Sequence, residues 1–328
     1  MIELKNHTNK ISLLLFSFLL FSTYCQSQVL MKRQVTLMGS VFQFTVVDAD
    51  SLSANRNIER AIAEIVRIEN LISEWRPETQ ISEVNRNAGI KPVKVDQEVF
   101  NLTKRAIQYS RMSGGAFDIS IAAMDKIWKF DGSMNEMPED EAIRKSVQNV
   151  GFESIVLDSI NTTIYLKHHG MKIGFGSIGK GYAADRGREL LRATGVKAGI
   201  VNASGDITTW GRQPSGKKWS IGITNPFKHH RTVKVLKVLE SAVVTSGSYE
   251  KFAEINGKRY AHIINPKTGY PSVGLTSVTV YGPSAEFANA LSTSVMVLGE
   301  KEGMKLLVQY PGYKGLLITD NGKLYSKK

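Results

Sequence analysis

The fold is decided by residues 172–211, which read KIGFGSIGKGYAADRGRELLRATGVKAGIVNASGDITTWG. The pattern predicts a strand, a glycine loop, a helix that ends near Thr194, a second strand from Ala198 and a tight turn before Asp206. Glycines at the start of a helix let backbone N–H groups approach a ligand, and the helix N-terminus adds partial positive charge. Together with Lys180, this arrangement is typical of a site for an anion such as a phosphate.

Two known glycine motifs overlap in this stretch, and each is incomplete. Residues 174–179 spell G-x-G-x-x-G, but Asn202 stands where a dinucleotide-binding fold places an acidic residue after the next strand. The same residues followed by Lys180 fit G-x-x-x-x-G-K, but Gly181 stands where a P-loop needs a hydroxyl group for magnesium. From this stretch alone, phosphate binding and a turn that only packs a helix on a sheet both remain open.

The N-terminal segment has the layout of a secretory signal. Lys5 and Lys10 precede an apolar run at residues 11–21, and small residues follow it. The run is too short to span a bilayer comfortably. We expect cleavage after Ser27, so that a mature chain of residues 28–328 works outside the cytosol.

Cys25 is the only cysteine of the chain. Lipid attachment at this residue is the alternative to soluble export, although Tyr24 is large where a lipoprotein signal usually has a small residue. A mature chain without cysteine excludes disulfides and thiolate metal sites, which suits a periplasm-like compartment. We therefore expect a periplasmic protein, either soluble or anchored to the membrane by a lipid.

The composition is that of a folded protein with a basic surface. The 328 residues are 42% hydrophobic and carry a net charge of +12, or +11 without the first 27 residues. A chain of this kind buries a substantial core, and its charge attracts anionic partners in general. Lys and Arg occur along the whole chain and no nucleic-acid motif accompanies them, so nucleic acid is not expected as a partner.

Hydrophobic periodicity predicts helices and strands without a linker or repeat between them. Helices are expected from residue 58 to an end near Trp75-Arg76-Pro77, and at residues 99–109, 139–150, 286–297 and around 306–307. Strands are expected at residues 34–47, with Gly39 marking a close approach or a bulge, and at 155–157, 163–166, 219–223, 233–238, 242–244, 251–255 and 277–281. A strand broken by two prolines and a glycine is expected over residues 257–271, and a last hairpin at Asn321-Gly322. We predict one mixed α/β domain over residues 28–328.

Few side chains outside the glycine stretch indicate chemistry by themselves. His262 precedes a turn with two prolines and a glycine, where it could serve as a general base or only pack. Asn289 and Thr293 lie on one face of an expected helix, where they could hold a hard cation or form a structural polar pair. The histidine pairs at 168–169 and 229–230 favour solvated loops, because adjacent residues of an extended chain point to opposite sides.

Several short motifs occur in the order found in the ApbE family of flavin transferases, which the chain resembles from about Met38 to Gly299. The residues that carry the resemblance are Met38-Gly39-Ser40, Ser73-Glu74-Trp75, Gly115-Ala116-Phe117-Asp118, Lys180-Gly181-Tyr182 with Asp185, Asn202-Ala203-Ser204-Gly205-Asp206, Thr245-Ser246-Gly247-Ser248-Tyr249, His262-Ile263-Ile264-Asn265-Pro266 with Thr268-Gly269, and Ala288 to Thr293. Their number and order make the resemblance far more specific than either glycine motif.

The resemblance implies both a fold and a reaction. The implied fold is a single α+β domain with antiparallel-rich sheets flanked by helices, similar to the T-fold. The implied reaction takes FAD as substrate and, with Mg²⁺, transfers its FMN half to a Thr or Ser hydroxyl of an acceptor flavoprotein, releasing AMP. This chemistry depends on charge neutralisation and positioning more than on covalent catalysis by the protein.

The resemblance also implies which residues form the site. The FAD site would contain Met38, Trp75, Ala116, Phe117, Asp118, Gly174, Lys180 and Ile264, with Trp75 stacked on a ring. The metal would be held by the Ser177 carbonyl, Asn289 and Thr293. The residues near the reacting phosphate would be His262, Asp206 and Lys180.

Three positions depart from the family pattern. The family usually has Asp where this chain has Asn289, and often where it has Gly174, so up to two negative charges are missing near the expected metal. A neutral amide oxygen should hold Mg²⁺ less tightly than a carboxylate. Ser204 also replaces a glycine, which narrows the approach to the ligand.

Our leading hypothesis is an exported FAD:protein FMN transferase. One alternative is a catalytically weakened FAD-binding protein of the periplasm, which the charge losses would explain. Another is an FAD pyrophosphatase that uses water as the acceptor and yields FMN and AMP. Association with the inner membrane would come from a lipid anchor or from a membrane-bound acceptor.

Overall fold

The structure, a computed structural model, describes residues 28–249 and 251–327. The expected signal segment and Cys25 lie outside the described residues. The centre of the molecule is an eight-stranded sheet in the order β1-β2-β6-β7-β10-β13-β14-β15. All strand pairs in this sheet are antiparallel. The expected α+β fold is confirmed, and the sheet is not that of a dinucleotide-binding fold, whose strands run mostly parallel.

The elements alternate along the whole chain. The strands of the large sheet are β1 (Val29–Leu37), β2 (Ser40–Asp48), β6 (Ala198–Ala203), β7 (Asp206–Trp210), β10 (Ser241–Gly247), β13 (Leu275–Gly282), β14 (Lys314–Thr319) and β15 (Leu324–Lys327). The helices are α2 (Ser51–Ile72), α3 (Gln80–Arg86), α4 (Gln97–Met112), η1 (Ile119–Ala123), α5 (Asp140–Ser146), η2 (Phe152–Ser154), α6 (Gly179–Ala193) and α7 (Ala285–Val308). The smaller sheets pair β3 (Val93–Lys94) and β4 (Ile155–Asp158) with β5 (Thr163–Leu166), β8 (Trp219–Asn225) with β9 (Lys228–Val238), and β11 (Phe252–Ile255) with β12 (Lys258–Ala261).

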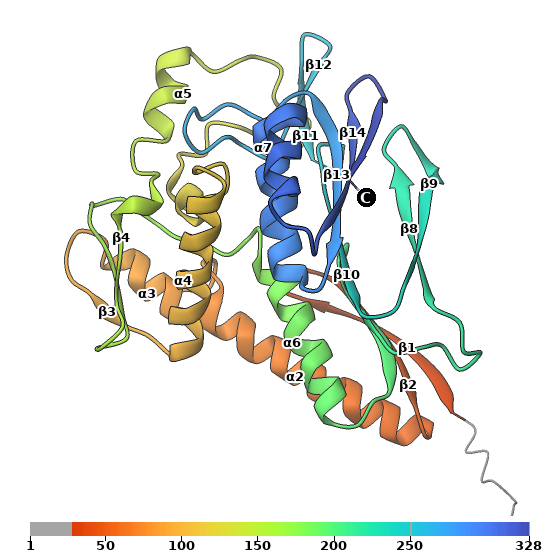
Figure 1. The fold of residues 1–328 in the computed structure, drawn as a ribbon. Coiled ribbons are helices and arrows are strands. Elements are labelled where there is room, and N and C mark those ends of the chain that lie inside the picture. The colour runs from red at the N-terminus through yellow and green to blue at the C-terminus, as the bar shows by residue number, and fades with distance from the viewer. Residues whose placement is uncertain (1–27, 250, 328) are drawn as a thin grey trace, which may run out of the picture.

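The large sheet lies between a layer of helices and a β-hairpin (Figure 1). On one face, Ile58 and Ile65 of α2 pack with Phe44 and Val201 of the sheet. On the same side, α7 covers β10 and β13. On the other face, the β8–β9 hairpin lies against the sheet through a separate core cluster. Alternation of apolar side chains to both faces explains why the sheet strands are buried on two sides.

Helix α7 is also tied to the part of the molecule that contains α4 and the small sheet (Figure 1). Glu286 of α7 is buried and accepts two hydrogen bonds from the Arg105 guanidinium, at 2.8 and 2.9 Å, and one from the Tyr109 hydroxyl at 2.9 Å. Such a bidentate Arg–carboxylate pair fixes orientation as well as distance. Helix α4 and the large sheet therefore both contact α7.

The N-terminal strand expected over residues 34–47 is a hairpin in the structure. Strands β1 and β2 are joined by Met38 and Gly39, whose φ angles of 49° and 66° are both positive. Two-residue hairpin turns need this backbone because it matches the twist of the strands. The backbone N–H of Met38 also donates to the Glu69 carboxylate at 3.0 Å. A methionine in this conformation gives no local turn signal, which is why a single bulged strand was the wrong prediction.

Other local predictions differ less. Helices α2 and α4, the β4–β5 hairpin and the last hairpin at Asn321-Gly322 are confirmed. The two late helices are merged into α7, with Gly299 as a non-helical residue at φ 75°. Residues 172–175, where a strand was predicted before the glycine loop, lie outside the strands. Within residues 28–249 and 251–327, no helix combines the length and the apolar character needed to cross a bilayer.

Candidate active site

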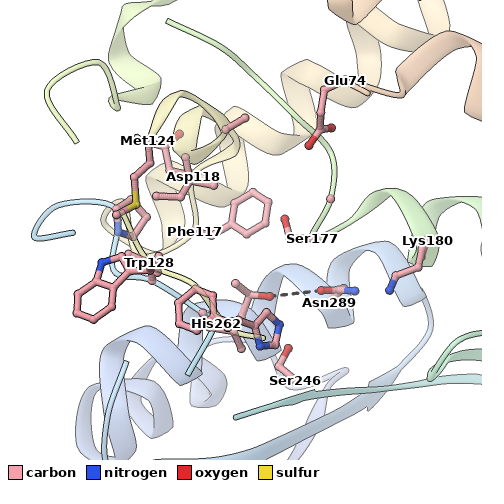
Figure 2. A pocket seen from close by; sticks show the side chains of 18 of the residues that line it. Glu74, Phe117, Asp118, Met124, Trp128, Ser177, Lys180, Ser246, His262 and Asn289 are labelled. Carbon is pink, nitrogen blue, oxygen red and sulfur yellow. Dashed lines mark hydrogen bonds between the residues drawn. The ribbon is translucent and has the colours of Figure 1, made fainter. Parts of the chain in front are cut away.

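A cavity of about 570 Å³ lies where α6, α7, η1, the end of β10 and the loop at His262 meet (Figure 2). This volume is typical of a small-molecule site. Of the residues that the sequence analysis assigned to the site, those in the cavity wall are Trp75, Ala116, Phe117, Asp118, Ser177, Lys180, Asp206, His262, Ile264, Asn289 and Thr293. The glycine turn with its lysine and the face of the late helix therefore border one cavity, although they are more than 100 residues apart.

A close contact between α6 and α7 brings Lys180 and Asn289 to the same cavity. A Cβ atom on Gly181 would lie 2.7 Å from the carbonyl oxygen of Ala285 and 3.1 Å from the nitrogen of Glu286. Only a glycine allows the two backbones to approach in this way. The position after Lys180 that excluded a P-loop is thus needed for helix packing.

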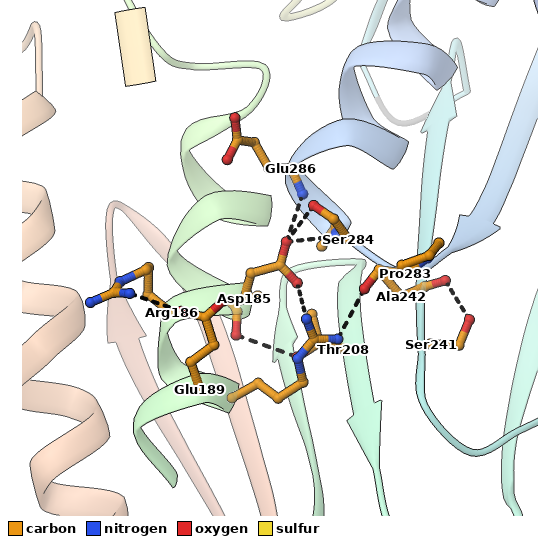
Figure 3. Close-up of polar contacts among 12 residues, drawn as sticks. Asp185, Arg186, Glu189, Thr208, Ser241, Ala242, Pro283, Ser284 and Glu286 are labelled. Carbon is orange, nitrogen blue, oxygen red and sulfur yellow. Dashed lines mark hydrogen bonds and ion pairs between the residues drawn. The ribbon is translucent and has the colours of Figure 1, made fainter. Parts of the chain in front are cut away.

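Asp185 locks the same junction one turn further along α6 (Figure 3). Its carboxylate accepts hydrogen bonds from the Ser284 hydroxyl at 2.8 Å and from the backbone N–H groups of Ala285 and Glu286 at 2.7 and 3.1 Å. Burial raises the pKa of the Asp185 carboxyl, and the charge of Arg188 at 3.2 Å opposes this shift. A carboxylate at the N-terminus of α7 satisfies free N–H groups and stabilises the helix dipole.

Asn289 forms a polar chain with Asp206 and Thr293. The Asn289 side-chain amide donates to the Asp206 carboxylate at 2.7 Å, and the Thr293 hydroxyl donates to the Asn289 amide oxygen at 3.3 Å. Asn289 and Asp206 are 7% and 5% exposed. The amide group thereby presents its donor to the carboxylate and its oxygen towards Thr293.

The oxygen atoms of these residues are suitable ligands for a hard cation such as Mg²⁺. Asp206, Asn289, Thr293 and Ser177 together offer a carboxylate, an amide oxygen, a hydroxyl and a backbone carbonyl at one side of the cavity. Oxygen ligands of these kinds are those that Mg²⁺ takes, usually with phosphate oxygens from a substrate. In the part of the chain that the structure describes, no cluster of three His, Cys, Asp or Glu residues could bind a metal by itself. The residues therefore fit a cation that is shared with a bound phosphate.

The His262 ring borders the cavity at the end of the β11–β12 hairpin (Figure 2). Its Nδ1 atom lies 3.1 Å from the carbonyl oxygen of Lys251. A carbonyl only accepts, so this contact is a hydrogen bond when Nδ1 carries the proton. The neutral ring then has its lone pair on Nε2, which can accept a proton from a bound hydroxyl group. Phe130 contacts the ring edge-on, with 6.4 Å between ring centroids.

Glu74 occupies the space beside Gly174. A Cβ atom on Gly174 would lie 2.5 Å from the Glu74 carboxylate, which accepts a hydrogen bond from the backbone N–H of Phe175 at 3.2 Å. Burial raises the pKa of the Glu74 carboxyl, and this N–H group opposes the shift. The Glu74 carboxyl group therefore fills the space that a side chain at residue 174 would need.

Trp75 lies at the open edge of the cavity and is 74% exposed. The ammonium group of Lys126 lies 5.0 Å from the centroid of its ring, a cation–π geometry. An exposed indole at a cavity mouth can stack on a planar ring of a ligand.

Two of the predicted site residues do not line the cavity. Met38 lies next to Gly179: its terminal methyl group would be 3.6 Å from a Cβ atom built on Gly179. Gly174 is covered by the side chain of Glu74. Asp118 does line the cavity, but its carboxylate also accepts from the Ser120 backbone N–H at 2.8 Å and the Phe152 N–H at 2.9 Å. Burial raises the pKa of this carboxyl. The side chain of Asp118 therefore holds the turn at the start of η1.

Sequence reasoning missed several residues of the wall. Glu74 and Ser246 belong to motifs that the sequence analysis named, but the local sequence does not indicate which residues of a motif face the cavity. The hydroxyl group of Ser246 pairs with that of Ser292 at 2.8 Å. Lys126, Trp128 and Phe130 come from an irregular segment without periodicity, so their aromatic and basic character was the only available signal.

Comparisons with known proteins identify relatives and solved structures that this chain resembles. An FAD:protein FMN transferase of Klebsiella pneumoniae is 31% identical over 287 residues, covering 87% of this chain and 88% of the relative. One from Treponema pallidum is 31% identical over 276 residues, covering 80% and 76%. The crystal structure of the ApbE protein of Thermotoga maritima superposes with a TM-score of 0.83 at 27% identity, covering 92% and 97%. That of the Pseudomonas stutzeri flavinyl transferase ApbE superposes with a TM-score of 0.80 at 26% identity, covering 92% and 94%. Residues 38–317 match the model of the ApbE family, and this chain belongs to that family.

Proposed function

We infer that this protein is an FAD:protein FMN transferase. The observation that carries the inference is the cavity at which Lys180, Asp206, His262 and Asn289 meet, in a chain whose relatives with this name match it over most of its length. The Lys180 ammonium, the Asp206 carboxylate and the His262 imidazole border one cavity, and this combination of groups suits the splitting of a pyrophosphate.

The reaction is a transfer of a phosphoryl-type group. The hydroxyl oxygen of the acceptor forms a bond to the FMN phosphorus of FAD, the bond from that phosphorus to the bridging oxygen breaks, and AMP leaves with the bridging oxygen. Nε2 of His262 accepts the proton of the hydroxyl group. The Lys180 ammonium and the N–H groups at the start of α6 stabilise the charge on the phosphate oxygens.

The bound dinucleotide also needs orientation. We propose that the Trp75 indole stacks on one of its planar rings, displacing the Lys126 ammonium, and that Phe117 and Ile264 border the ligand. Asp185 and Gly181 act through α7, because they hold Asn289 and Thr293 opposite Lys180. Accurate placement of this kind is worth several orders of magnitude in rate.

We propose that Asp206, Asn289, Thr293 and the Ser177 carbonyl hold Mg²⁺ in the loaded enzyme. When bound, the ion would neutralise negative charge on the pyrophosphate oxygens. Because only one of these four ligands is a carboxylate, the affinity of the site for Mg²⁺ would depend strongly on the phosphates of FAD. The acceptor would present a Thr or Ser hydroxyl from a flavoprotein, and the chain would act in the periplasm, soluble or lipid-anchored.

The test incubates the purified protein with FAD, MgCl₂ and an acceptor domain, and measures covalent flavin on the acceptor by in-gel fluorescence together with AMP by chromatography. We expect labelling and AMP release in equal amounts, and neither with His262→Ala. AMP release that does not depend on the acceptor would instead indicate the FAD pyrophosphatase. FAD binding without AMP or labelling would favour the weakened binding protein.

A further inference from the structure

The positive charge of the chain is concentrated around the β8–β9 hairpin. From Ile207 to Leu239 the sequence has no Asp or Glu and seven basic residues, which are Arg212, Lys217, Lys218, Lys228, Arg231, Lys234 and Lys237. About a tenth of the chain thus supplies seven of its twelve net positive charges. The expectation that basic residues are spread along the chain rather than clustered is therefore wrong for this segment, because no acidic residue offsets its basic ones.

The hairpin buries its large apolar side chains and exposes its basic ones. Trp219, Ile221 and Leu236 are buried against Val47 and Ala198 on the face of the large sheet that the helices do not cover (Figure 1). The side chains of Lys217, Lys218, Lys228, Arg231, Lys234 and Lys237 are all exposed, and Lys237, between buried Leu236 and Val238 on β9, faces away from this core.

These charges are not neutralised within the described chain. None of the seven basic residues takes part in an ion pair with a residue in 28–249 or 251–327. The acidic residues that flank the segment are otherwise engaged, since Asp206 is buried in the cavity wall and Glu240 pairs with Arg192 at 2.6 Å. The outer face of the hairpin is therefore a surface of uncompensated positive potential.

The dimensions and composition of this face suit an extended partner. Lys228 and Lys237 are nine residues apart on one strand, which corresponds to about 30 Å. A row of basic side chains of this length is much longer than a single phosphate group. Phe227 at the hairpin turn is 51% exposed and Val235 on the outer face is 49% exposed. Aromatic and aliphatic side chains among lysines are typical of surfaces that lie at the headgroup level of a bilayer.

The position of the hairpin argues against the acceptor protein as its partner. The cavity opens among α6, α7 and η1, on the helical side of the large sheet, whereas β8–β9 covers the opposite face. An acceptor seated on the hairpin would be separated from the cavity by the sheet. A membrane on this face leaves the cavity open to the solvent side.

We propose that the outer face of β8–β9 docks the protein on a bilayer of anionic phospholipids. The attraction is electrostatic and acts within a Debye length, so it is strong at low salt and weak at high salt. It does not depend on the transferase reaction, and it would keep the cavity directed away from the bilayer.

The test is co-sedimentation of the purified full chain with phosphatidylcholine vesicles, with and without phosphatidylglycerol. We expect binding only to the anionic vesicles, with release by salt. The variant Lys228→Glu/Arg231→Glu/Lys234→Glu is expected to bind at least about a hundredfold more weakly, since each basic residue at an anionic surface contributes about a fivefold effect. Phe227→Ser, which keeps every charge, should weaken binding about tenfold through lost apolar burial.

The matched control is Lys91→Glu/Lys94→Glu/Lys301→Glu, which changes the net charge equally at exposed lysines outside the hairpin. It should bind nearly as well as the unmodified chain, and equal thermal unfolding of the variants excludes a folding defect. All forms carry the same N-terminus, so an anchor there cannot cause a difference between them. Equal loss in both triple variants, or no loss in the hairpin variant, would overturn the proposal. Binding of an acidic protein through the hairpin with unchanged vesicle binding would overturn it as well.

Discussion

The substitution Asn289→Asp tests the geometry of the proposed metal site most directly. In the structure the Asn289 amide donates to the Asp206 carboxylate at 2.7 Å, and both side chains are almost fully buried. An aspartate at 289 replaces that donor with a second carboxylate at the same distance. We expect the variant to be less stable than the unmodified protein at pH 7 when no divalent ion is present.

The magnitude follows from the distance. Two negative charges 2.7 Å apart repel each other by about 6 kcal/mol at an effective dielectric constant of about 20. Protonation of one carboxyl limits this cost, because at pH 7 it requires about 4 kcal/mol for a group with an ordinary pKa of about 3.9. A loss of about 2 to 4 kcal/mol in the free energy of unfolding is therefore expected at pH 7.

The loss should depend on pH with a defined sign. The pair of carboxylates has a raised pKa in the folded state, so folding takes up a proton above pH 4. The destabilisation is then greatest at neutral pH and falls to at most about 1.5 kcal/mol at pH 5. Mg²⁺ should reverse this destabilisation at pH 7, because a cation between two carboxylates removes their repulsion. Two carboxylates should also bind the ion more tightly than the single carboxylate of the unmodified protein.

The assay is urea unfolding at pH 5 and pH 7, with EDTA or with MgCl₂. Asn101→Asp, on the exposed side of α4, is the matched control and should change stability by less than about 0.5 kcal/mol. If Asn289→Asp is as stable as the unmodified protein at pH 7 in EDTA, or if Mg²⁺ stabilises both equally, residues 206 and 289 do not form the pair described here.

Three further substitutions examine other contacts. Gly181→Ala places a Cβ atom 2.7 Å from the Ala285 carbonyl oxygen and should lower the free energy of unfolding by about 1 to 3 kcal/mol in a urea titration. Gly312→Ala, with open space around the glycine, should leave the free energy of unfolding unchanged. Equal effects of the two substitutions would contradict the α6–α7 contact. Glu74→Gln should raise the melting temperature at pH 7 but not at pH 4, because burial raises the pKa of Glu74 and its ionisation therefore costs stability as the pH rises above the ordinary value of 4.5; a pH-independent difference would contradict this. Trp75→Ala should weaken FAD binding by about 1 to 3 kcal/mol in fluorescence titrations while Trp75→Phe retains most of it, and because the indole is 74% exposed the unfolding of the ligand-free protein should not change. Unaltered FAD affinity in Trp75→Ala would exclude stacking at this residue.

Local patterns in the sequence were sufficient for much of the fold. Helices α2 and α4 and the β4–β5 hairpin follow from periodicity and turn residues, since these signals depend on neighbours within a few positions. The hairpin at Met38-Gly39 was missed because its backbone conformation is set by the pairing of two nine-residue strands and not by the residues of the turn. Tertiary contacts override weak local preferences in such cases.

The order of short motifs along the chain determined the family and most of the residues around the cavity. The tertiary structure alone decided how those residues meet. Asn289 and Asp206 are 83 residues apart, Glu74 and Phe175 are 101 residues apart, and each pair is joined only by packing of separate elements. The basic residues of β8–β9 likewise form one exposed surface because the apolar residues of the hairpin are buried on the sheet. Burial and close packing act between distant segments, and a linear sequence does not state which segments those are.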